Sequence, residues 1–236
     1  MATGYPRSTS TQITEVLETK NKDANCQNLP DFPEEISSAT GSTIQGQPLV
    51  CGGSDDNDVR EDCWTLEKSK SSWRRLNGMK SKRRRACSVP VNDSHLWVFG
   101  GSDGDRRLQS TEFVDLEGNS KAGPEMPEPI SSHAIVALKD ATYLLIGGTT
   151  DNKTYYFSEK TQNWTPGPSL KIRRHAHTAG IIIDDVTAAK YIVVAGGWDL
   201  RLERSPSRLD STEILKYPGS TEWQHGKHSN NLIFDI

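Results

Sequence analysis

The sequence predicts an all-β protein made of repeated sheets, and three observations support this prediction. Diglycine pairs recur at a nearly constant interval along the 236 residues. Each pair ends a short run of apolar residues, and polar, turn-forming residues follow each pair at once. A sequence period close to 50 residues is typical of the blades of a β-propeller.

The diglycines define the period. Their second glycines are residues 53, 101, 148 and 197, so the separations are 48, 47 and 49 residues. Gly4 lies one further period before residue 53 and marks a preceding unit. Glycine permits backbone angles and close approaches that a Cβ would prevent. The four pairs are Gly52-Gly53, Gly100-Gly101, Gly147-Gly148 and Gly196-Gly197.

The apolar runs before these glycines predict buried strands. Residues 96–99 and 191–195 are examples, rich in β-branched and aromatic side chains and only four or five residues long. Residues 54–58 and 102–105 are typical of the turns that follow. We therefore expect one strand of every blade to end at a diglycine.

Glutamates and tryptophans recur in phase with the glycines. The glutamates follow threonine at Glu15, Glu112 and Glu213. The tryptophans recur downstream at Trp73, Trp164 and Trp223. We interpret the tryptophans as core residues that pack the blades. The glutamates are better explained by hydrogen bonds between blades, or by ion pairs with repeated arginines, than by a catalytic role.

Two insertions interrupt the repeat pattern, one before and one after the fourth diglycine. One of about seven residues falls near residues 184–190, and one of about five falls within residues 198–210. Because long insertions in repeat proteins tend to map to a binding face, we expect the second insertion to contact a partner. Its arginines are Arg201, Arg204 and Arg208.

Taken together, these features resemble the kelch repeat family. The matching elements are the diglycine, the Thr-Glu strand, the downstream tryptophan, and the arginine or histidine before the next strand. A cysteine-containing group of invertebrate kelch-like proteins, regarded as secreted, is similar in further motifs. These motifs are Cys26, the Leu-Pro-Asp-Phe-Pro of residues 29–33, Cys51-Gly52-Gly53 and Cys63. The resemblance implies four-stranded blades arranged around an axis.

On this basis we expect about five four-stranded blades over residues 1–225, with four full repeat intervals. The ring is either incomplete or closed in an atypical way. The units are approximately 1–53, 54–101, 102–148, 149–197 and 198–225. Residues 226–236 depart from the pattern and form a divergent C-terminal tail.

The cysteines predict one disulfide bond. Cys51 ends one predicted strand and Cys63 begins the next, so an antiparallel pair would place them opposite each other. The resembling kelch-like proteins have cysteines at these positions as well. Free thiols in the core are the alternative. Zinc is disfavoured because the spacings match no ligand pair, and the partners of Cys26 and Cys87 stay open.

Composition and motifs disfavour several classes of function. The net charge of −3 gives no reason to expect nucleic acid or an acidic membrane surface as a partner. No apolar stretch approaches the roughly 18 residues of a membrane span. The catalytic and nucleotide-binding motifs are missing, so we expect no catalysis, no cofactor and no metal. His175 and His177 would share one face of a strand, but a third metal ligand is not indicated.

Two basic clusters occupy equivalent loops two units apart. They contain Arg83, Arg84 and Arg85, and then Arg173 and Arg174. Solvated loops explain both clusters. The alternative is a docking patch for an acidic partner or a sulfated glycan.

The resemblance implies a non-catalytic binding module that presents its loops to a protein or glycan partner. One alternative is the substrate-recognition propeller of a cullin-type ubiquitin ligase, whose BTB or F-box part is not found in this sequence. A less favoured alternative is a fragment of a copper-radical oxidase similar to galactose oxidase. The resemblance favours an extracellular location, although the sequence has no signal peptide, and the cytoplasm is the alternative.

Overall fold

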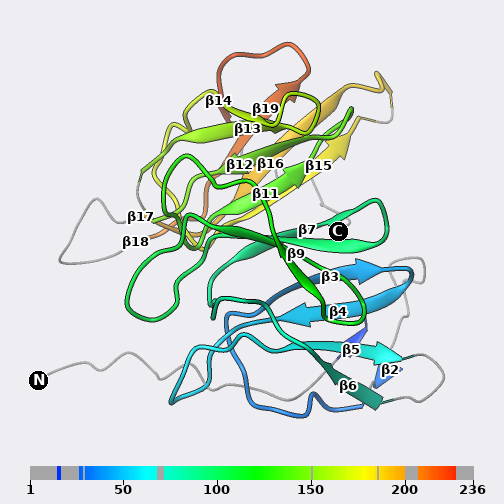
Figure 1. Ribbon diagram of the computed structural model, residues 1–236. Coiled ribbons are helices and arrows are strands. Elements are labelled where there is room, and N and C mark those ends of the chain that lie inside the picture. The colour runs from blue at the N-terminus through cyan, green and yellow to red at the C-terminus, as the bar shows by residue number, and fades with distance from the viewer. Residues whose placement is uncertain are drawn as a thin grey trace, which may run out of the picture.

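The chain folds into a β-propeller whose blades follow one another in sequence order (Figure 1). The structure is a computed structural model, and it describes residues 15–16, 27–28, 30–67, 72–149, 151–184, 186–199 and 207–226. Within these residues the strands form four four-stranded antiparallel sheets and two two-stranded pairs. The all-β propeller predicted from the repeats is therefore confirmed.

Each blade is a meander of four consecutive antiparallel strands, except where the second insertion interrupts the fourth blade. The first blade contains β3 (Thr40–Ile44), β4 (Gln47–Cys51), β5 (Cys63–Glu67) and β6 (Ser72–Leu76). The second contains β7 (Cys87–Val91), β8 (His95–Phe99), β9 (Thr111–Val114) and β10 (Ser120–Ala122). The third contains β11 (Ala134–Ala137), β12 (Thr142–Ile146), β13 (Thr154–Ser158) and β14 (Asn163–Pro166). The fourth contains β15 (Thr178–Ile183), β16 (Lys190–Ala195), β19 (Thr212–Tyr217) and β20 (Gln224–His225).

The two short pairs account for the remaining strands. β1 (Glu15–Val16) pairs with β2 (Gln27–Asn28), and β17 (Trp198–Asp199) pairs with β18 (Ser207–Arg208). The described residues thus form four complete blades where the sequence predicts about five units. The first expected unit, residues 1–53, contains the pair β1–β2 together with β3 and β4 of the first blade, and residues 227–236 of the expected tail lie outside the described part of the chain.

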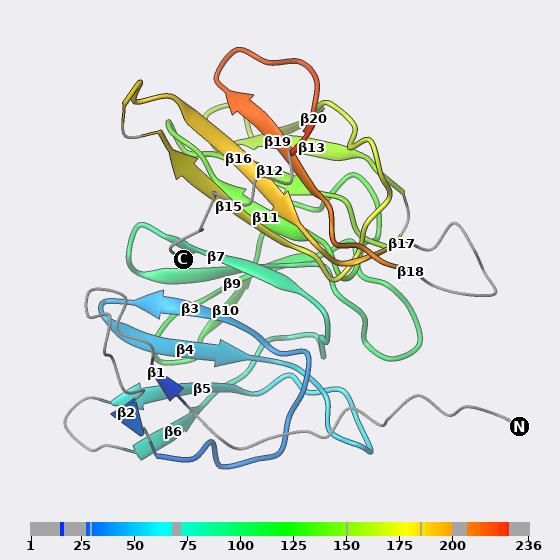
Figure 2. The ribbon, with the colours of Figure 1, turned by 180° about the vertical axis from the view of Figure 1, so that it is seen from behind.

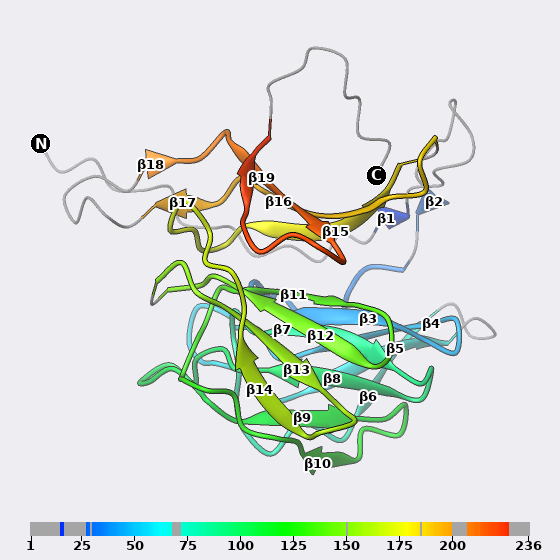
Figure 3. The same cartoon turned by 90° about the horizontal axis from the view of Figure 1, so that it is seen from above.

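The first strands of the blades lie next to one another. β3 contacts β7, β7 contacts β11, and β11 contacts β15. Seen from behind, the blades follow one another from β3–β6 to β15–β20 (Figure 2). In the view from above, the second and third blades overlap while the fourth lies to one side (Figure 3). No helix able to span a membrane occurs among the described residues.

The hydrophobic core lies between the blades. On β8, Leu96 and Val98 pack in a cluster with the first blade, whereas Trp97 and Phe99 pack in a cluster with the third. Successive side chains of a strand point to opposite faces, so a strand covered on both faces has apolar residues at every position. This arrangement explains why the runs before the diglycines are continuously apolar.

The diglycines lie where the segment leading to the next blade crosses the end of the second strand. Gly53 donates a main-chain hydrogen bond of 2.7 Å to the carbonyl of Arg83, and Gly101 donates one of 2.9 Å to that of Ile130. At Gly101 the φ angle is +92°, and a Cβ would lie 2.8 Å from the carbonyl oxygen of Arg84. Glycine is required there by both the backbone angle and the close approach.

Both predicted insertions fall in the fourth blade. The first forms the turn between β15 and β16, where the main-chain amide of Asp184 donates a hydrogen bond of 2.8 Å to the carbonyl of Ala189. The second separates β16 from β19 and begins and ends with the pair β17–β18. The strands on either side remain paired in register, so the blade accommodates both insertions.

Candidate functional site

The loops after the diglycines gather at one edge of the propeller, which we call the loop face. It comprises the described parts of the connections between the second and third strands of the blades, at residues 52–62, 100–110, 147–149, 151–153, 196–199 and 207–211. Because the strands alternate in direction, these connections and the segments entering each blade share one edge. The inserted pair β17–β18 is part of this edge.

A groove of about 670 Å³ lies on the loop face between the first and second blades. Its walls are the loops after β4 and β8 and the segment that joins the two blades. The lining residues are Ser54–Val59, Glu61, Lys80–Lys82, Arg84, Asp103–Arg106 and Leu108. We call this feature the loop-face groove.

The loop-face groove carries more negative than positive charge, with six carboxylates and four basic side chains among its lining residues. A hydrogen bond from Lys82 lowers the pKa of Asp58, and main-chain amides, first that of Arg106, lower the pKa of Asp103. Both carboxyl groups are therefore ionised at neutral pH. The groove is suited to a polar partner with basic side chains.

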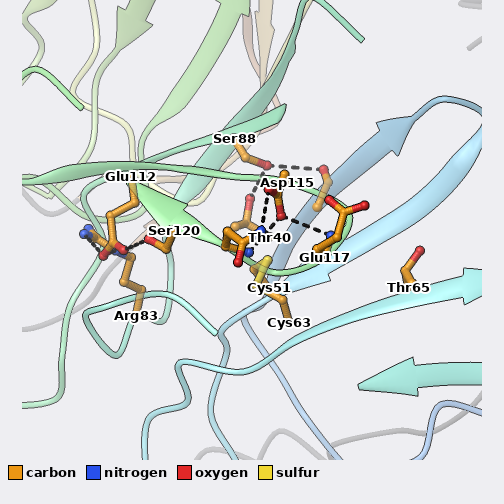
Figure 4. Close-up of a disulfide and its surroundings, with 12 residues drawn as sticks. Thr40, Cys51, Cys63, Thr65, Arg83, Ser88, Glu112, Asp115, Glu117 and Ser120 are labelled. Atoms are coloured by element: carbon orange, nitrogen blue, oxygen red, sulfur yellow. Dashed lines mark hydrogen bonds and ion pairs between the residues drawn. A yellow bond between two sulfur atoms is a disulfide. The ribbon is translucent and has the colours of Figure 1, made fainter. Parts of the chain in front are cut away.

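Arg83 does not contribute to this surface, because its side chain is fully buried. Nη2 donates to Oε1 of Glu112 over 2.8 Å, and Nη1 donates to the carbonyls of Gly100 and Ser110 over 2.8 and 2.9 Å. Figure 4 shows the guanidinium beside the carboxylate, with Ser120 on its other side. The ion pair predicted for the repeated glutamate is present at this position.

Glu112 also holds the segment between the first two blades. Its carboxylate accepts hydrogen bonds from the main-chain amides of Lys80 and Ser81 over 2.7 and 3.1 Å, and from the hydroxyl of Ser120. Burial alone would raise the pKa of Glu112, but hydrogen bonds from Ser120 and Arg83 outweigh burial and lower it. The side chain is a structural anion, as predicted.

The fourth blade repeats this arrangement. The buried Arg174 donates to Glu213 over 3.0 Å and to the carbonyls of Gly196 and Ser211 over 2.8 and 3.1 Å. Glu213 accepts further hydrogen bonds from the main-chain amides of residues 171 and 172. Arg83 and Arg174 were expected in docking patches. The structure corrects this expectation, because both side chains form buried ion pairs.

The third blade makes the same connection without an Arg–Glu ion pair. Ile130 occupies the position of Arg83, because each carbonyl accepts the hydrogen bond from the preceding diglycine. Tyr155 occupies the position of Glu112 in the strand register and donates to Glu128 over 2.7 Å. This is why the Arg–Glu pattern is interrupted along the sequence.

The other predicted binding arginines lie closer to solvent. Arg85 and Arg173 are exposed, and Arg84 is half-buried in the loop-face groove. Arg208 is exposed, with its guanidinium carbon 5.1 Å from the centre of the Trp198 ring. Arg201 and Arg204 lie outside the described residues. The equivalent segments put Arg85 and Arg173 on the same face, but in blades that are not neighbours.

The repeated tryptophans pack as predicted. Trp223 is fully buried and donates to the carbonyl of Pro168 over 2.8 Å. Trp73 and Trp164 are half-buried, and Trp73 contacts the ring of Phe32 at 4.9 Å between centroids. In the second blade Ser120 occupies this position in the register. There the side chain of Ser120 does not fill the core, and its hydroxyl donates a hydrogen bond to Glu112.

Cys51 and Cys63 form the predicted disulfide, with an S–S distance of 2.03 Å (Figure 4). They face each other in register across β4 and β5. Both are buried between the first two blades. Cys87 is a free thiol whose pKa is raised by burial, and Cys26 lies outside the described residues.

Two histidine rings near the inner strands are buried, those of His133 and His177, and the ring of His133 lacks a hydrogen-bond partner among the described residues. Burial lowers the pKa of His133 to about 3 and that of His177 to about 4, so both rings are neutral at pH 7. His175 and His177 precede β15 rather than lying within it, contrary to expectation. The described residues contain no group of three or more potential metal ligands.

Comparison with known proteins supports the propeller fold. No family model matches the sequence. Kelch-like protein 35 of Mus musculus is 28% identical over 151 residues, which are 61% of this chain and 26% of the relative. The matched part thus spans about a quarter of that relative's length. The solved structure of YjhT superimposes with a TM-score of 0.74 at 16% identity, over 89% of this chain and 84% of that one, and so shows the fold.

Proposed function

We propose that this chain, a kelch-repeat β-propeller with distant sequence similarity to Kelch-like protein 35, is a binding module whose loop-face groove receives a segment of a partner protein. The observation that carries the proposal is the groove of about 670 Å³ formed by loops from two blades. Loops held on a rigid scaffold are the usual location of binding residues.

The charges of the groove favour a basic segment of the partner. Arg83 and Arg174 are buried and cannot contact a ligand. The surface of the protein therefore offers fewer positive charges to an acidic partner or a sulfated glycan than the sequence suggests. Asp56 and Asp105 are exposed and line the groove. Lysine or arginine side chains of a partner would pair with such carboxylates.

We extend the proposal to the finer points of the resemblance. The chain functions without catalysis, and it is similar to the cysteine-containing secreted kelch-like proteins. The Cys51–Cys63 disulfide supports an oxidising compartment, where such bonds persist. The ubiquitin-ligase propeller and the copper oxidase remain the alternatives.

Selection of a random peptide library on the purified protein tests this function. Affinities of the selected peptides are then measured for Asp56→Asn/Asp105→Asn, which removes two groove charges. The matched control is Asp140→Asn, an exposed aspartate in the turn between β11 and β12 at the opposite edge. We expect enrichment of basic peptides and a loss of affinity of about three- to tenfold in the groove variant only. Equal affinity of the selected peptides for the wild type, the groove variant and the control variant would contradict the proposal.

A further inference from the structure

A second cavity lies between the second and third blades, at the strand ends opposite the loop face. Its volume is about 360 Å³, which is within the range of roughly 300–1,000 Å³ for small-molecule sites. It is bordered by the β7–β8 turn of one blade and the β13–β14 turn of the next. We call it the inter-blade cavity.

One wall of the inter-blade cavity is aromatic. The half-buried ring of Phe113 stacks on Trp97 at 4.8 Å between centroids and meets the exposed ring of His95 edge-on at 6.5 Å. Trp97 is itself fixed by a hydrogen bond of 2.9 Å from Nε1 to Thr111. The two accessible rings form a corner into which a third ring can pack in the offset or edge-on geometry that aromatic pairs prefer.

A row across three strands places a positive charge beside this wall. In the register of the second blade, Trp97 is opposite Phe113, and Phe113 is opposite Lys121. Residues that are directly opposite in antiparallel strands project from the same face of the sheet. The ammonium group of Lys121 is exposed and lines the cavity.

The third blade supplies a negative charge to the same cavity. Glu159 accepts a hydrogen bond of 2.5 Å at Oε1 from the hydroxyl of Tyr143, which orients the carboxylate. Lys121 and Glu159 both line the cavity, yet they form no ion pair with each other in the described structure. Two opposite charges and an aromatic wall in one cavity complement a ligand that has a ring, a carboxylate and an ammonium group.

We propose that the inter-blade cavity binds a free amino acid with an aromatic side chain. The ring packs in the corner of Phe113 and His95, the carboxylate pairs with Lys121, and the ammonium group pairs with Glu159. None of these residues lines the loop-face groove, so this site and the proposed peptide site can fail independently.

Calorimetric titration with L-tryptophan and L-phenylalanine tests the proposal. Phenethylamine lacks the carboxylate, 3-phenylpropionate lacks the ammonium group, and L-alanine lacks the ring. We expect the two aromatic amino acids to bind at least about tenfold more tightly than each of the three incomplete probes. Equal binding by an incomplete probe, or no binding of either amino acid at millimolar concentration, overturns the assignment.

Two variants then locate the site. Lys121→Met and Glu159→Gln are each expected to weaken L-tryptophan binding about tenfold, and the glutamine can still accept the hydrogen bond from Tyr143. Lys139→Met is the matched control, since this exposed lysine lies in the β11–β12 turn outside the cavity. If both site variants bind like the control, the ligand does not occupy the inter-blade cavity.

Discussion

Replacing Arg83 with isoleucine removes one partner of a buried ion pair and leaves the other in place. In the wild-type protein the guanidinium binds Glu112 and two main-chain carbonyls, and both side chains are almost fully buried. Isoleucine is the residue that the third blade uses at this position, Ile130, so its shape is compatible with the backbone there. The substitution therefore tests the charge more than the fit.

The expected cost is large because Glu112 would stay buried with only neutral hydrogen-bond donors. Breaking a buried pair by removing one partner typically costs about 3–5 kcal/mol of unfolding free energy. The double variant Arg83→Ile/Glu112→Tyr copies the Ile–Tyr solution of the third blade and removes the stranded charge. It should recover part of the loss, but not all of it, because the amides of Lys80 and Ser81 lose their acceptor.

Urea unfolding at pH 7 measures these differences for the wild type, both variants and the control Arg85→Gln, whose side chain is exposed in the same segment. We expect the deficit of Arg83→Ile to shrink as the pH falls towards 4. The pKa of Glu112 is lowered in the wild type, which therefore loses stability on acidification, whereas the isolated Glu112 of the variant would gain stability by protonation. A deficit below about 1 kcal/mol at pH 7, or a double variant less stable than the single one, would refute the reasoning.

Three further outcomes are expected. Cys51→Ala/Cys63→Ala should lower the unfolding free energy by about 3 kcal/mol, since the disulfide closes a loop of 12 residues, and dithiothreitol should not destabilise this variant further. The free energy of unfolding should fall as the pH is lowered from 6.5 to 4, by up to about 1.4 kcal/mol per pH unit for each of His133 and His177. Their pKa values in the folded protein, about 3 and about 4, lie below the pKa of a histidine in the unfolded chain. The unfolded chain therefore takes up protons first on acidification. Urea titrations of His133→Met should show a shallower dependence, and an unchanged slope would contradict the assignment. Gly101→Ala should lower the free energy of unfolding by about 1–3 kcal/mol in the same assay, because the φ angle is +92° and the new methyl group would lie 2.8 Å from a carbonyl oxygen. An unchanged free energy of unfolding would show that the crossing segment can move.

The sequence predicts the strands and the disulfide because both depend on local pattern. A strand covered on both faces must be apolar at every position, and it must end where the segment leading to the next blade crosses it. An apolar run followed by a diglycine therefore identifies such a strand in the sequence. Cys51 and Cys63 end and begin adjacent antiparallel strands, so the register brings them together without any distant contact. Features of this kind can therefore be recognised in the sequence without the three-dimensional structure.

The roles of the arginines could not be assigned from sequence in the same way. Aligning the repeats on alanine matches Arg85 with His133 and His175, whereas the hydrogen bonds from the diglycines match Arg83 with Ile130 and Arg174. On the alanine alignment Arg83 would match Ser131 and Arg173, each one residue away from Ile130 and Arg174, and in the fourth blade this single step exchanges the buried Arg174 for the exposed Arg173. The correct phase depends on main-chain contacts between blades, which leave no residue pattern of their own.

The inter-blade cavity was missed for a related reason. Its aromatic wall and Lys121 come from three strands whose register aligns them, and Glu159 comes from the next blade. Each of these residues is unremarkable in its own segment. Only the packing of two blades brings the aromatic wall, Lys121 and Glu159 to one cavity.

The buried ion pair links the stability of the fold to the loop-face groove. The third blade makes the same main-chain hydrogen bond through Ile130, so a blade does not need an arginine at that position to join its neighbour. What the Arg83–Glu112 pair adds is a fixed position for the amides of Lys80 and Ser81, which line the groove. Since buried polar groups are directional whereas apolar contacts are not, the pair defines the wall of the groove more sharply than an Ile–Tyr contact would. The Arg174–Glu213 pair of the fourth blade fixes the main-chain amides of residues 171 and 172 in the same way.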